Sequence, residues 1–556
     1  MAIKDKEQKQ KTDIKIGQLQ RTAEEEKAKN LAEELGFPYL NLKISTIDDE
    51  ALAISNETDS KNAKAAIIQK KQKELFVAVA DPRLEETKSF IKNLENQNYK
   101  TTIRVSSISG LKRAWERYKD IKPERAEISE KIEISPEELK EIQSSINTIA
   151  DLKQKLEQQN IQTTQVLNII MAAGLKLEAS DIHFETEENA TRLRFRLDGI
   201  LQDATDIPTA TYGLLLSRIK ILSELKLNVH DKPQDGRFSF NSEGTEIEIR
   251  TSIIPGDNGE NVVLRILDPK TIGLKLENLG IQDYDYKIIG NELKKPNGMI
   301  ITTGPTGSGK TTLLYAFLKK VNDPGSKIIT LEDPIEYHLE GIEQTQVEAE
   351  KGYTFATGLR SILRQDPDII LVGEIRDAET ATTAINAALT GHLVFSTLHT
   401  NDAAGAIPRL VDMKVNQTMI PPALNLVIAQ RLVRRVCPKC SKDIKPDKET
   451  MKKIKTGLEN LPSRVPKPKL DNITIKKASE KGCPYCNFTG YKGRIGVFEL
   501  FIIDDPMEKT ILQTPSVAQI KETAAKAGMV TMKQDGMLKV LQKITTMDEV
   551  ERVLGA

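Results

Sequence analysis

A glycine-rich segment at residues 304–312 constrains this chain more than any other feature. It reads Gly-Pro-Thr-Gly-Ser-Gly-Lys-Thr-Thr and fits the phosphate-binding loop, in which a glycine and four further residues precede Gly-Lys-Ser/Thr. The apolar run 299–303 before it predicts a strand, and the amphipathic run 312–319 after it predicts a helix. This context favours a nucleoside triphosphate site over an ordinary glycine-rich turn.

Each part of this loop has an expected role. The glycines let backbone N–H groups turn around a β-phosphate, and the helix N-terminus adds a partial positive charge. We expect Lys310 to reach the β- and γ-phosphates and the hydroxyl of Thr311 to bind Mg²⁺. The predicted nucleotide-binding residues of the loop are Gly304, Pro305, Thr306, Gly307, Ser308, Gly309, Lys310, Thr311 and Thr312.

Acidic residues follow two further predicted strands. Strand 327–331 runs into Glu-Asp-Pro-Ile-Glu at 332–336, where three carboxylates are well placed for metal and water; a solvated loop cluster is the alternative. The run 368–372 is followed by Gly373 and Glu374, in the form of a Walker B strand, and predicts that Glu374 holds Mg²⁺ through water.

Two of the five histidines flank one apolar run. His392 and His399 stand at the two ends of the predicted strand 393–398, among hydroxyl residues. A lone histidine is more often a hydrogen-bonded structural residue than a catalyst. The strand-end position favours assigning both histidines to the nucleotide site.

The four cysteines form two Cys-x-x-Cys pairs, separated by residues 441–482. The ligands would be Cys437, Cys440, Cys483 and Cys486. Four thiolates suit Zn²⁺ as a closed tetrahedral structural site, with unmetallated thiols and a redox pair as the alternatives. The long spacing predicts that residues 441–482, which are rich in lysine and proline, loop out as an insertion.

The sequence texture predicts a multidomain α/β chain. A charged arm (1–30) precedes a small α/β domain (31–118), a charged helical linker (119–162), a second domain with strands of period two (163–285), and the domain of the phosphate loop (286–556), with the cysteine module at about 436–495. In the last domain strands alternate with helices, which predicts a parallel sheet that binds ligands at its carboxyl ends. Residues 233–237 are predicted to form a turn.

The overall composition excludes little but shows no bias toward nucleic acid or membrane. Lys+Arg and Asp+Glu are both 80, so the formal net charge is zero. No stretch approaches the ~18 apolar residues of a membrane span, and the first residues lack a signal-peptide core. We therefore expect a cytoplasmic protein.

From 166 to 554 the motifs resemble those of the secretion ATPases of the PilB/GspE type, which drive type IV pilus assembly and type II secretion. Residues 304–312 resemble the Walker A loop of that family, 329–336 its acidic Asp box, 359–377 its Walker B segment and 390–401 its His box. The four cysteines resemble the zinc module of its assembly and secretion motors. Residues 31–118 are similar, more loosely, to its small N-terminal domain, without the Arg-Leu-Gly-led repeat that binds cyclic di-GMP in some members, so that ligand is not expected.

The resemblance implies a RecA-like P-loop domain, a PAS-like α/β second domain and a homohexameric ATPase using ATP, Mg²⁺ and Zn²⁺. It also implies that Glu336 is the catalytic base and that Arg250 and Arg265 reach a neighbouring subunit's nucleotide. Arg360, Arg364 and Arg431 resemble the arginines that the family carries within its ATPase domain. The implied partners are an inner-membrane platform protein and associated cytoplasmic pilus or secretion components, at the inner face of the cytoplasmic membrane.

We expect a motor of type IV pilus assembly, with the type II secretion motor as the nearest alternative. A nucleic-acid-translocating RecA-like ATPase that grips through residues 441–482 is an alternative of another class. It is disfavoured because that insertion offers no aromatic side chains on which bases could stack, so no stable nucleic acid binding is expected. A scaffold that binds nucleotide without hydrolysis is disfavoured by the full set of acidic residues.

Overall fold

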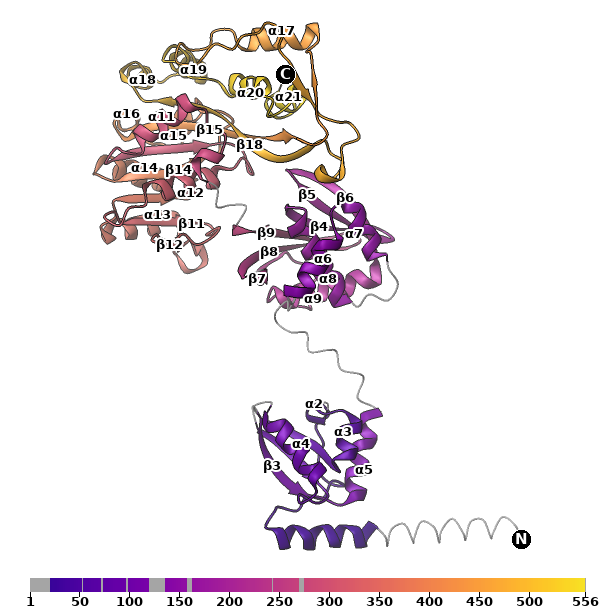
Figure 1. Ribbon diagram of the computed structural model, residues 1–556. Helices are drawn as coiled ribbons and strands as arrows, with labels where there is room; N and C mark the ends of the chain where they lie inside the picture. Colours follow the sequence, from indigo (N-terminus) through magenta and orange to yellow (C-terminus); the bar gives the residue numbers. More distant parts are fainter. Residues whose placement is uncertain are drawn as a thin grey trace. The chain divides into compact units, whose positions relative to one another are not determined.

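The computed structural model describes residues 21–555 except 53, 72–73, 97–98, 120–135, 158–162, 243 and 270–274. The chain divides into two compact units, Met1–Ile128 and Ser129–Ala556, which are described separately (Figure 1). Residues 1–20 of the expected arm lie outside the described residues.

The first unit is the expected small α/β domain. Its sheet has the order β1-β2-β3, with β1 antiparallel and β3 parallel to the central strand. Residues 21–35 are helical and bury Ala28 and Ala32 against Val105, so the helical end of the arm belongs to this domain. The elements are α2 (Asp49–Leu52), α3 (Glu57–Asn62), β1 (Ala65–Lys71), β2 (Glu74–Val79), α4 (Glu85–Asn96), β3 (Lys100–Val105) and α5 (Ile108–Glu116).

In the second unit, residues 136–267 form a domain around an antiparallel sheet of order β6-β5-β4-β9-β8-β7. Its strands alternate buried and less buried side chains as the period of two predicts, most regularly in β5. The strands are β4 (Ala179–Thr186), β5 (Ala190–Leu197), β6 (Ile200–Pro208), β7 (Gln234–Ser242), β8 (Thr245–Gly256) and β9 (Gly259–Leu267), and the main helices are α8 (Thr163–Lys176) and α9 (Thr209–Leu222).

Two expectations for this region are wrong. Within the expected linker (119–162), residues 136–156 are not a separate segment, because α6 (Pro136–Ser145) and α7 (Ile149–Leu156) bury Leu139 and Leu152 in the core of the second domain. Residues 234–237 begin β7 rather than forming a turn. Gly236 is required inside that strand because a Cβ there would lie 2.3 Å from the carbonyl oxygen of Ser223, at the end of α9.

The phosphate-loop domain contains the predicted sheet, with the order β12-β11-β13-β14-β10-β15-β18. All neighbouring strands are parallel except β15 and β18, which pair antiparallel. The strands are β10 (Gly298–Thr303), β11 (Ile328–Glu332), β12 (Glu343–Gln346), β13 (Ile369–Val372), β14 (Leu393–Leu398), β15 (Leu424–Val436) and β18 (Tyr491–Ile502).

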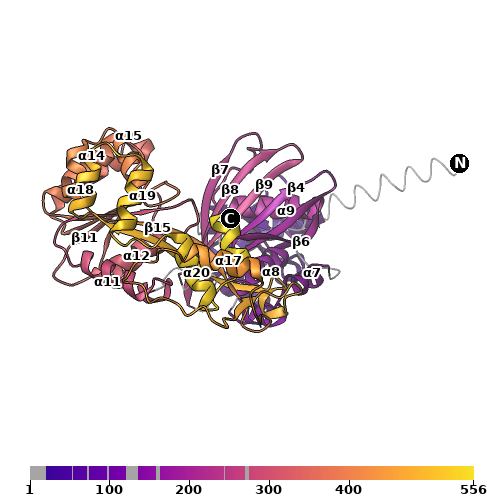
Figure 2. The same ribbon diagram turned by 90° about the horizontal axis from the view of Figure 1, so that it is seen from above.

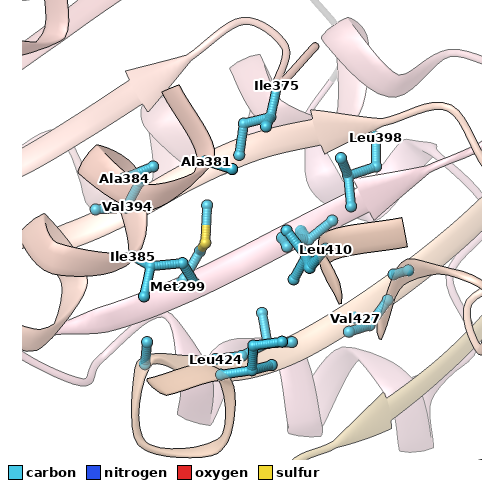
Figure 3. Close-up of a cluster of buried hydrophobic side chains, with 14 of the residues drawn as sticks. Met299, Ile375, Ala381, Ala384, Ile385, Val394, Leu398, Leu410, Leu424 and Val427 are labelled. Atoms are coloured by element: carbon cyan, nitrogen blue, oxygen red, sulfur yellow. The ribbon is translucent and has the colours of Figure 1, made fainter. Parts of the chain in front are cut away.

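Helices cover both faces of this sheet. Figure 3 shows one face, where Met299, Val394 and Leu398 of the central strands meet Ala381, Ala384 and Ile385 of α14. On the other face Ile300 packs against α12. Figure 2 shows α18 and α19 over the part of the domain that holds α14 and α15, and Figure 1 shows α16 between α18 and α14. The helices are α11 (Asp283–Glu292), α12 (Lys310–Val321), α13 (Phe355–Ile362), α14 (Ala378–Leu389), α15 (Ala406–Asp412), α16 (Ile420–Ala423), α18 (Asp505–Ile511) and α19 (Val517–Lys526).

The segment between the cysteine pairs joins the core of the same domain. Ile454 and Val465 of this segment pack against Met537 and Val550 of the last helices. At the other end of the domain, Leu276 is part of the hydrophobic core that includes α12. The domain therefore begins about ten residues earlier than the expected 286. The elements are β16 (Lys442–Ile444), α17 (Lys448–Gly457), β17 (Ile475–Lys477), α20 (Met532–Leu541) and α21 (Met547–Leu554).

None of the helices in the described part of the chain combines the length and the apolar composition that a membrane crossing requires.

Candidate active site and cysteine cluster

Four adjacent strands place the predicted site residues at one edge of the sheet. Strands β11, β13, β14 and β10 are neighbours and parallel, so their carboxyl ends coincide. Glu332 ends β11, Glu374 follows β13, His399 follows β14, and the phosphate loop at 304–309 follows β10. Residues from four separate motifs therefore surround one position, as expected for a ligand site of a parallel sheet.

The phosphate loop has the backbone that an anion cradle needs. Gly304, Gly307 and Gly309 have φ angles of 148°, 77° and 89°, in the region that favours glycine. A Cβ on Gly304 would lie 2.5 Å from the carbonyl oxygen of Gln430 and 2.6 Å from the hydroxyl of Ser308. The Ser308 hydroxyl is buried and has no hydrogen-bond partner in the structure, so the loop fits a bound phosphate that supplies one.

Lys310 opens α12 and folds back over its own loop. Its Nζ donates to the carbonyl oxygens of Gly304 at 2.8 Å and Pro305 at 3.2 Å. Burial lowers the pKa of Lys310, while the charge of Glu374 opposes this shift. Thr311, half-buried, follows it as the second residue of the helix. The ammonium group of Lys310 and the hydroxyl of Thr311 therefore both lie in the first turn of α12, next to the phosphate loop.

Two basic side chains contact the carboxylate of Glu374. His399 Nε2 lies 3.1 Å from one of its oxygens, and Arg376 forms an ion pair with the other. Arg376 also lies 3.8 Å from the carboxylate of Asp333 in the Asp box. Glu374 is 14% exposed, so its oxygens remain reachable for a hard cation such as Mg²⁺.

The two glutamates of the Asp box have different environments. Glu332 is buried, and burial raises the pKa of its carboxyl group although Thr330, Tyr315 and Gln344 donate hydrogen bonds to it. Glu336 is 29% exposed, and one of its oxygens lies 2.9 Å from Nη1 of Arg250. Of these two, only Glu336 is accessible enough to contact a water molecule.

The other predicted arginines have partners outside the phosphate loop. Arg265 is 55% exposed and pairs with Asp181 at 2.9 Å. Arg360 pairs with Glu379 on the surface, and Arg364 donates to the carbonyl oxygen of Arg360. Arg431 directly follows Gln430 beside the phosphate loop but donates to the carbonyl oxygen of Val553.

His392 lies at the wrong end of its strand for the nucleotide site of its own chain. It precedes β14, and its carbonyl oxygen accepts from Gly298 N, at the amino end of β10. Its Nδ1 lies 3.0 Å from the carbonyl oxygen of Ala387, near the end of α14. His392 therefore has the environment of a hydrogen-bonded structural histidine. Of the two histidines, only His399 lies at the edge of the sheet formed by the carboxyl ends of the strands.

The four cysteines lie together as the spacing predicted. All four Sγ atoms are within 4.8 Å of one another, and the Cys437–Cys483 and Cys440–Cys486 distances are both 3.8 Å. Zn–S bonds of ~2.3 Å in a tetrahedron give S–S distances of about 3.8 Å. Backbone N–H groups of Cys483 and Gly490 also point at Sγ of Cys486, so the cluster has the geometry to bind a metal ion.

Three residues of the site, Arg376, Tyr315 and Gln344, were not predicted from the sequence. Arg376 carried a usable signal, since a cation two positions after Glu374 at a strand end belongs to the same site. Tyr315 and Gln344 carried none, because a tyrosine in an amphipathic helix and a glutamine on an edge strand resemble ordinary core and surface residues.

The comparisons agree with this geometry. Residues 155–552 match the protein family described as Type II/IV secretion system protein. The chain is 45% identical over 389 residues to the type II secretion system protein E of Pseudomonas aeruginosa, covering 70% of this chain and 75% of that protein. It is 34% identical over 558 residues to the type IV pilus assembly ATPase PilB of Myxococcus xanthus, covering 98% of this chain and 95% of that protein.

The fold is also that of a known ATPase structure. The ATPase DotB of Legionella pneumophila superposes with a TM-score of 0.51 at 22% identity, covering 71% of this chain and 96% of DotB. The chain is an ATPase and belongs to the Type II/IV secretion system protein family, in its PilB/GspE-like branch.

Proposed function

We propose that this chain hydrolyses ATP to power type IV pilus assembly, as a homohexamer. The observation that supports pilus assembly is the extent of the match to PilB of Myxococcus xanthus, 98% of this chain, which includes the first unit. The match to the type II secretion protein E of Pseudomonas aeruginosa has higher identity but covers 70% of the chain. The type II secretion motor remains the alternative.

In the proposed reaction, the loop of residues 304–312 holds the triphosphate and Lys310 neutralises its β- and γ-phosphates. Glu336 orients and deprotonates the attacking water, because it is the exposed one of the two glutamates of the Asp box. Arg250 lies beside Glu336 and places positive charge where the transferred phosphoryl group develops negative charge. His399 and Arg376 hold the carboxylate of Glu374 in place.

Mg²⁺, when bound, neutralises charge on the β- and γ-phosphates. The Thr311 hydroxyl and the carboxylate of Glu374 would hold it, since both are oxygen ligands at the mouth of the loop. Zn²⁺ would occupy the cysteine cluster as a structural ion, with no open position for chemistry. The proposed partners are a platform protein of the inner membrane and its associated cytoplasmic components.

Glu336→Gln tests the chemistry. The amide keeps the shape of the side chain but cannot take a proton, so kcat should fall by at least ~100-fold while ATP still binds. Glu374→Gln should instead shift the Mg²⁺ dependence to higher concentration. Glu340→Gln, an exposed position on the same loop, is the matched control and should hydrolyse ATP like the wild type. Normal turnover by Glu336→Gln would remove this residue as the base.

The biological role is tested in the cell that encodes the chain. Replacing the gene by the Glu336→Gln form should abolish surface pili and leave secreted proteins at their normal level. Loss of secretion with normal pili would instead assign the chain to a type II secretion system.

A further inference from the structure

The buried glutamate of the Asp box has an unusual set of partners. Glu332 is 3% exposed and accepts from Thr330 Oγ1 at 2.6 Å, from Gln344 Nε2 at 3.2 Å and from the hydroxyl of Tyr315. Among the described residues no basic side chain forms an ion pair with Glu332. Because this carboxyl group is buried and its oxygens already accept three hydrogen bonds, it is not accessible to water or to a metal ion from solvent.

Tyr315 joins this buried carboxylate to the exposed one. It lies on α12, five residues after Lys310, and is completely buried. Its hydroxyl has one hydrogen, which it donates to Glu332. The hydroxyl oxygen is then an acceptor, and the backbone N–H of Glu336 donates to it at 3.3 Å. Glu332 therefore fixes the direction of a hydrogen bond that supports the main chain of Glu336.

Gln344 holds the chain just beyond Glu336. Its amide nitrogen donates to the carbonyl oxygen of Tyr337 at 3.1 Å, and its amide oxygen accepts from Leu339 N at 2.7 Å. The ring of Tyr337 lies edge-on against that of Tyr315, with 4.7 Å between centroids. Residues 336–339 are thus fixed by side chains of α12 and β12 rather than by backbone pairing.

We propose that the Tyr315 hydroxyl, oriented by Glu332, is a positioning group that sets Glu336 relative to the phosphate loop. Tyr315 and Lys310 stand on the same helix, so the Tyr315 hydroxyl ties the main chain of Glu336 to the helix that carries the lysine of the phosphate loop. Glu332 then serves to orient the Tyr315 hydroxyl and is not an alternative catalytic base. This inference rests on the proposed role of Glu336, and it adds the residues that control its placement.

Tyr315→Phe removes the hydroxyl and keeps the ring. We expect kcat to fall by about 10- to 100-fold, because displacing a catalytic group by ~1 Å costs up to ~100-fold, while KM and the affinity for an ATP analogue change less than about threefold. Tyr491→Phe is the matched control, since it removes a buried tyrosine hydroxyl that lies 2.8 Å from Thr546 in the same domain. That control should lose a similar amount of stability and keep its kcat.

A double-mutant cycle separates positioning from general destabilisation. If Glu332 acts through Tyr315, the double variant Tyr315→Phe/Glu332→Gln should lose no more kcat than Tyr315→Phe alone. A folded Tyr315→Phe enzyme with wild-type kcat, or additive losses in the cycle, would overturn the proposal. Should Tyr315→Phe fail to fold, Glu332→Gln carries the test: lower kcat at unchanged KM supports the proposal, and wild-type kcat overturns it.

Glu336→Gln distinguishes failure of this inference from failure of the proposed base. Normal hydrolysis by Glu336→Gln would overturn both. An inactive Glu336→Gln enzyme beside a fully active Tyr315→Phe enzyme would overturn the positioning role and leave the base in place.

Discussion

Nη1 of Arg250 lies 2.9 Å from the carboxylate of Glu336 in the same chain. A second nitrogen of the guanidinium donates to the carbonyl oxygen of Ile335 at 2.6 Å. Arg250 stands on β8 of the second domain, which has no phosphate loop, and is only 20% exposed. The resemblance implied that this arginine reaches a neighbouring subunit's nucleotide, whereas the structure places it at the Asp box of its own chain.

This contact predicts that Arg250 completes the site of its own chain. Arg250→Ala should lower kcat by about 10³-fold, as expected for an arginine that stabilises phosphoryl transfer. Mixing Arg250→Ala subunits with Lys310→Ala subunits should then restore no ATPase activity, since every site still lacks one of the two residues. The measurement is ATP turnover of hexamers shown to contain both variants.

The control for mixing is the wild type, which should add its own activity in proportion when combined with either variant. Recovery of activity by the two inactive variants would mean that arginine and loop come from different chains, and would return Arg250 to the role that the resemblance implied.

Lys310→Ala should abolish turnover. The ammonium group is the main side-chain charge at the mouth of the loop, where it donates to the carbonyl oxygens of Gly304 and Pro305. We expect less than about a tenth of the wild-type rate, which corresponds to ~1.4 kcal/mol or more. Lys320→Ala, at the far end of the same helix, should keep its activity. Turnover by Lys310→Ala would exclude this loop as the hydrolytic site.

Local sequence patterns correctly predicted that site residues directly follow strands of the sheet, because each motif is continuous in sequence. The loop at 304–312 and Glu374 each follow an apolar run that is a strand of the sheet. Period and spacing do not say which end of a strand faces the ligand, so His392 and His399 were both assigned to the site although a whole strand separates them.

Long-range packing explains the remaining differences. The helices at 136–156 look like a charged linker because their apolar residues are few, yet those residues complete a core formed by strands far along the chain. Gly236 indicates a turn in sequence, but here it allows a strand to pass the end of a helix. The links from Tyr315 to Glu332 and Glu336 depend on two separate elements meeting, which no local pattern encodes.

Metal removal should destabilise the cysteine module. Elemental analysis should find about one Zn per chain, and Cys437→Ser/Cys440→Ser should lower the melting temperature while ATP still binds. The reason is that the four Sγ atoms lie within 4.8 Å of one another, so a bound Zn²⁺ would cross-link two segments that are far apart in the chain. Ser441→Ala, beside the first pair, is the control. Metal-free protein with an unchanged melting temperature would contradict the structural role.

The last prediction concerns a buried charge cluster at α11. Burial raises the pKa of Asp285 from 3.8 to about 6, although Arg464 lies 2.8 Å away and opposes the shift; Asp535 and Lys539 are the other charges that face it. The folded protein therefore binds this proton more tightly than the unfolded chain. This carboxyl group stabilises the fold fully below about pH 3.8, and that contribution is lost as the pH rises through about 6.

Asp285→Asn removes this dependence. The free energy of unfolding of the variant, relative to the wild type, should therefore rise by up to about 3 kcal/mol between pH 4 and pH 7, which is the free energy equivalent of the change in pKa. Denaturant unfolding at several pH values measures it, with Asp283→Asn, exposed on the same helix, as the control whose difference from the wild type stays constant. A difference for Asp285→Asn that is independent of pH would mean that Asp285 is ionised throughout, and that Arg464 compensates fully for its burial.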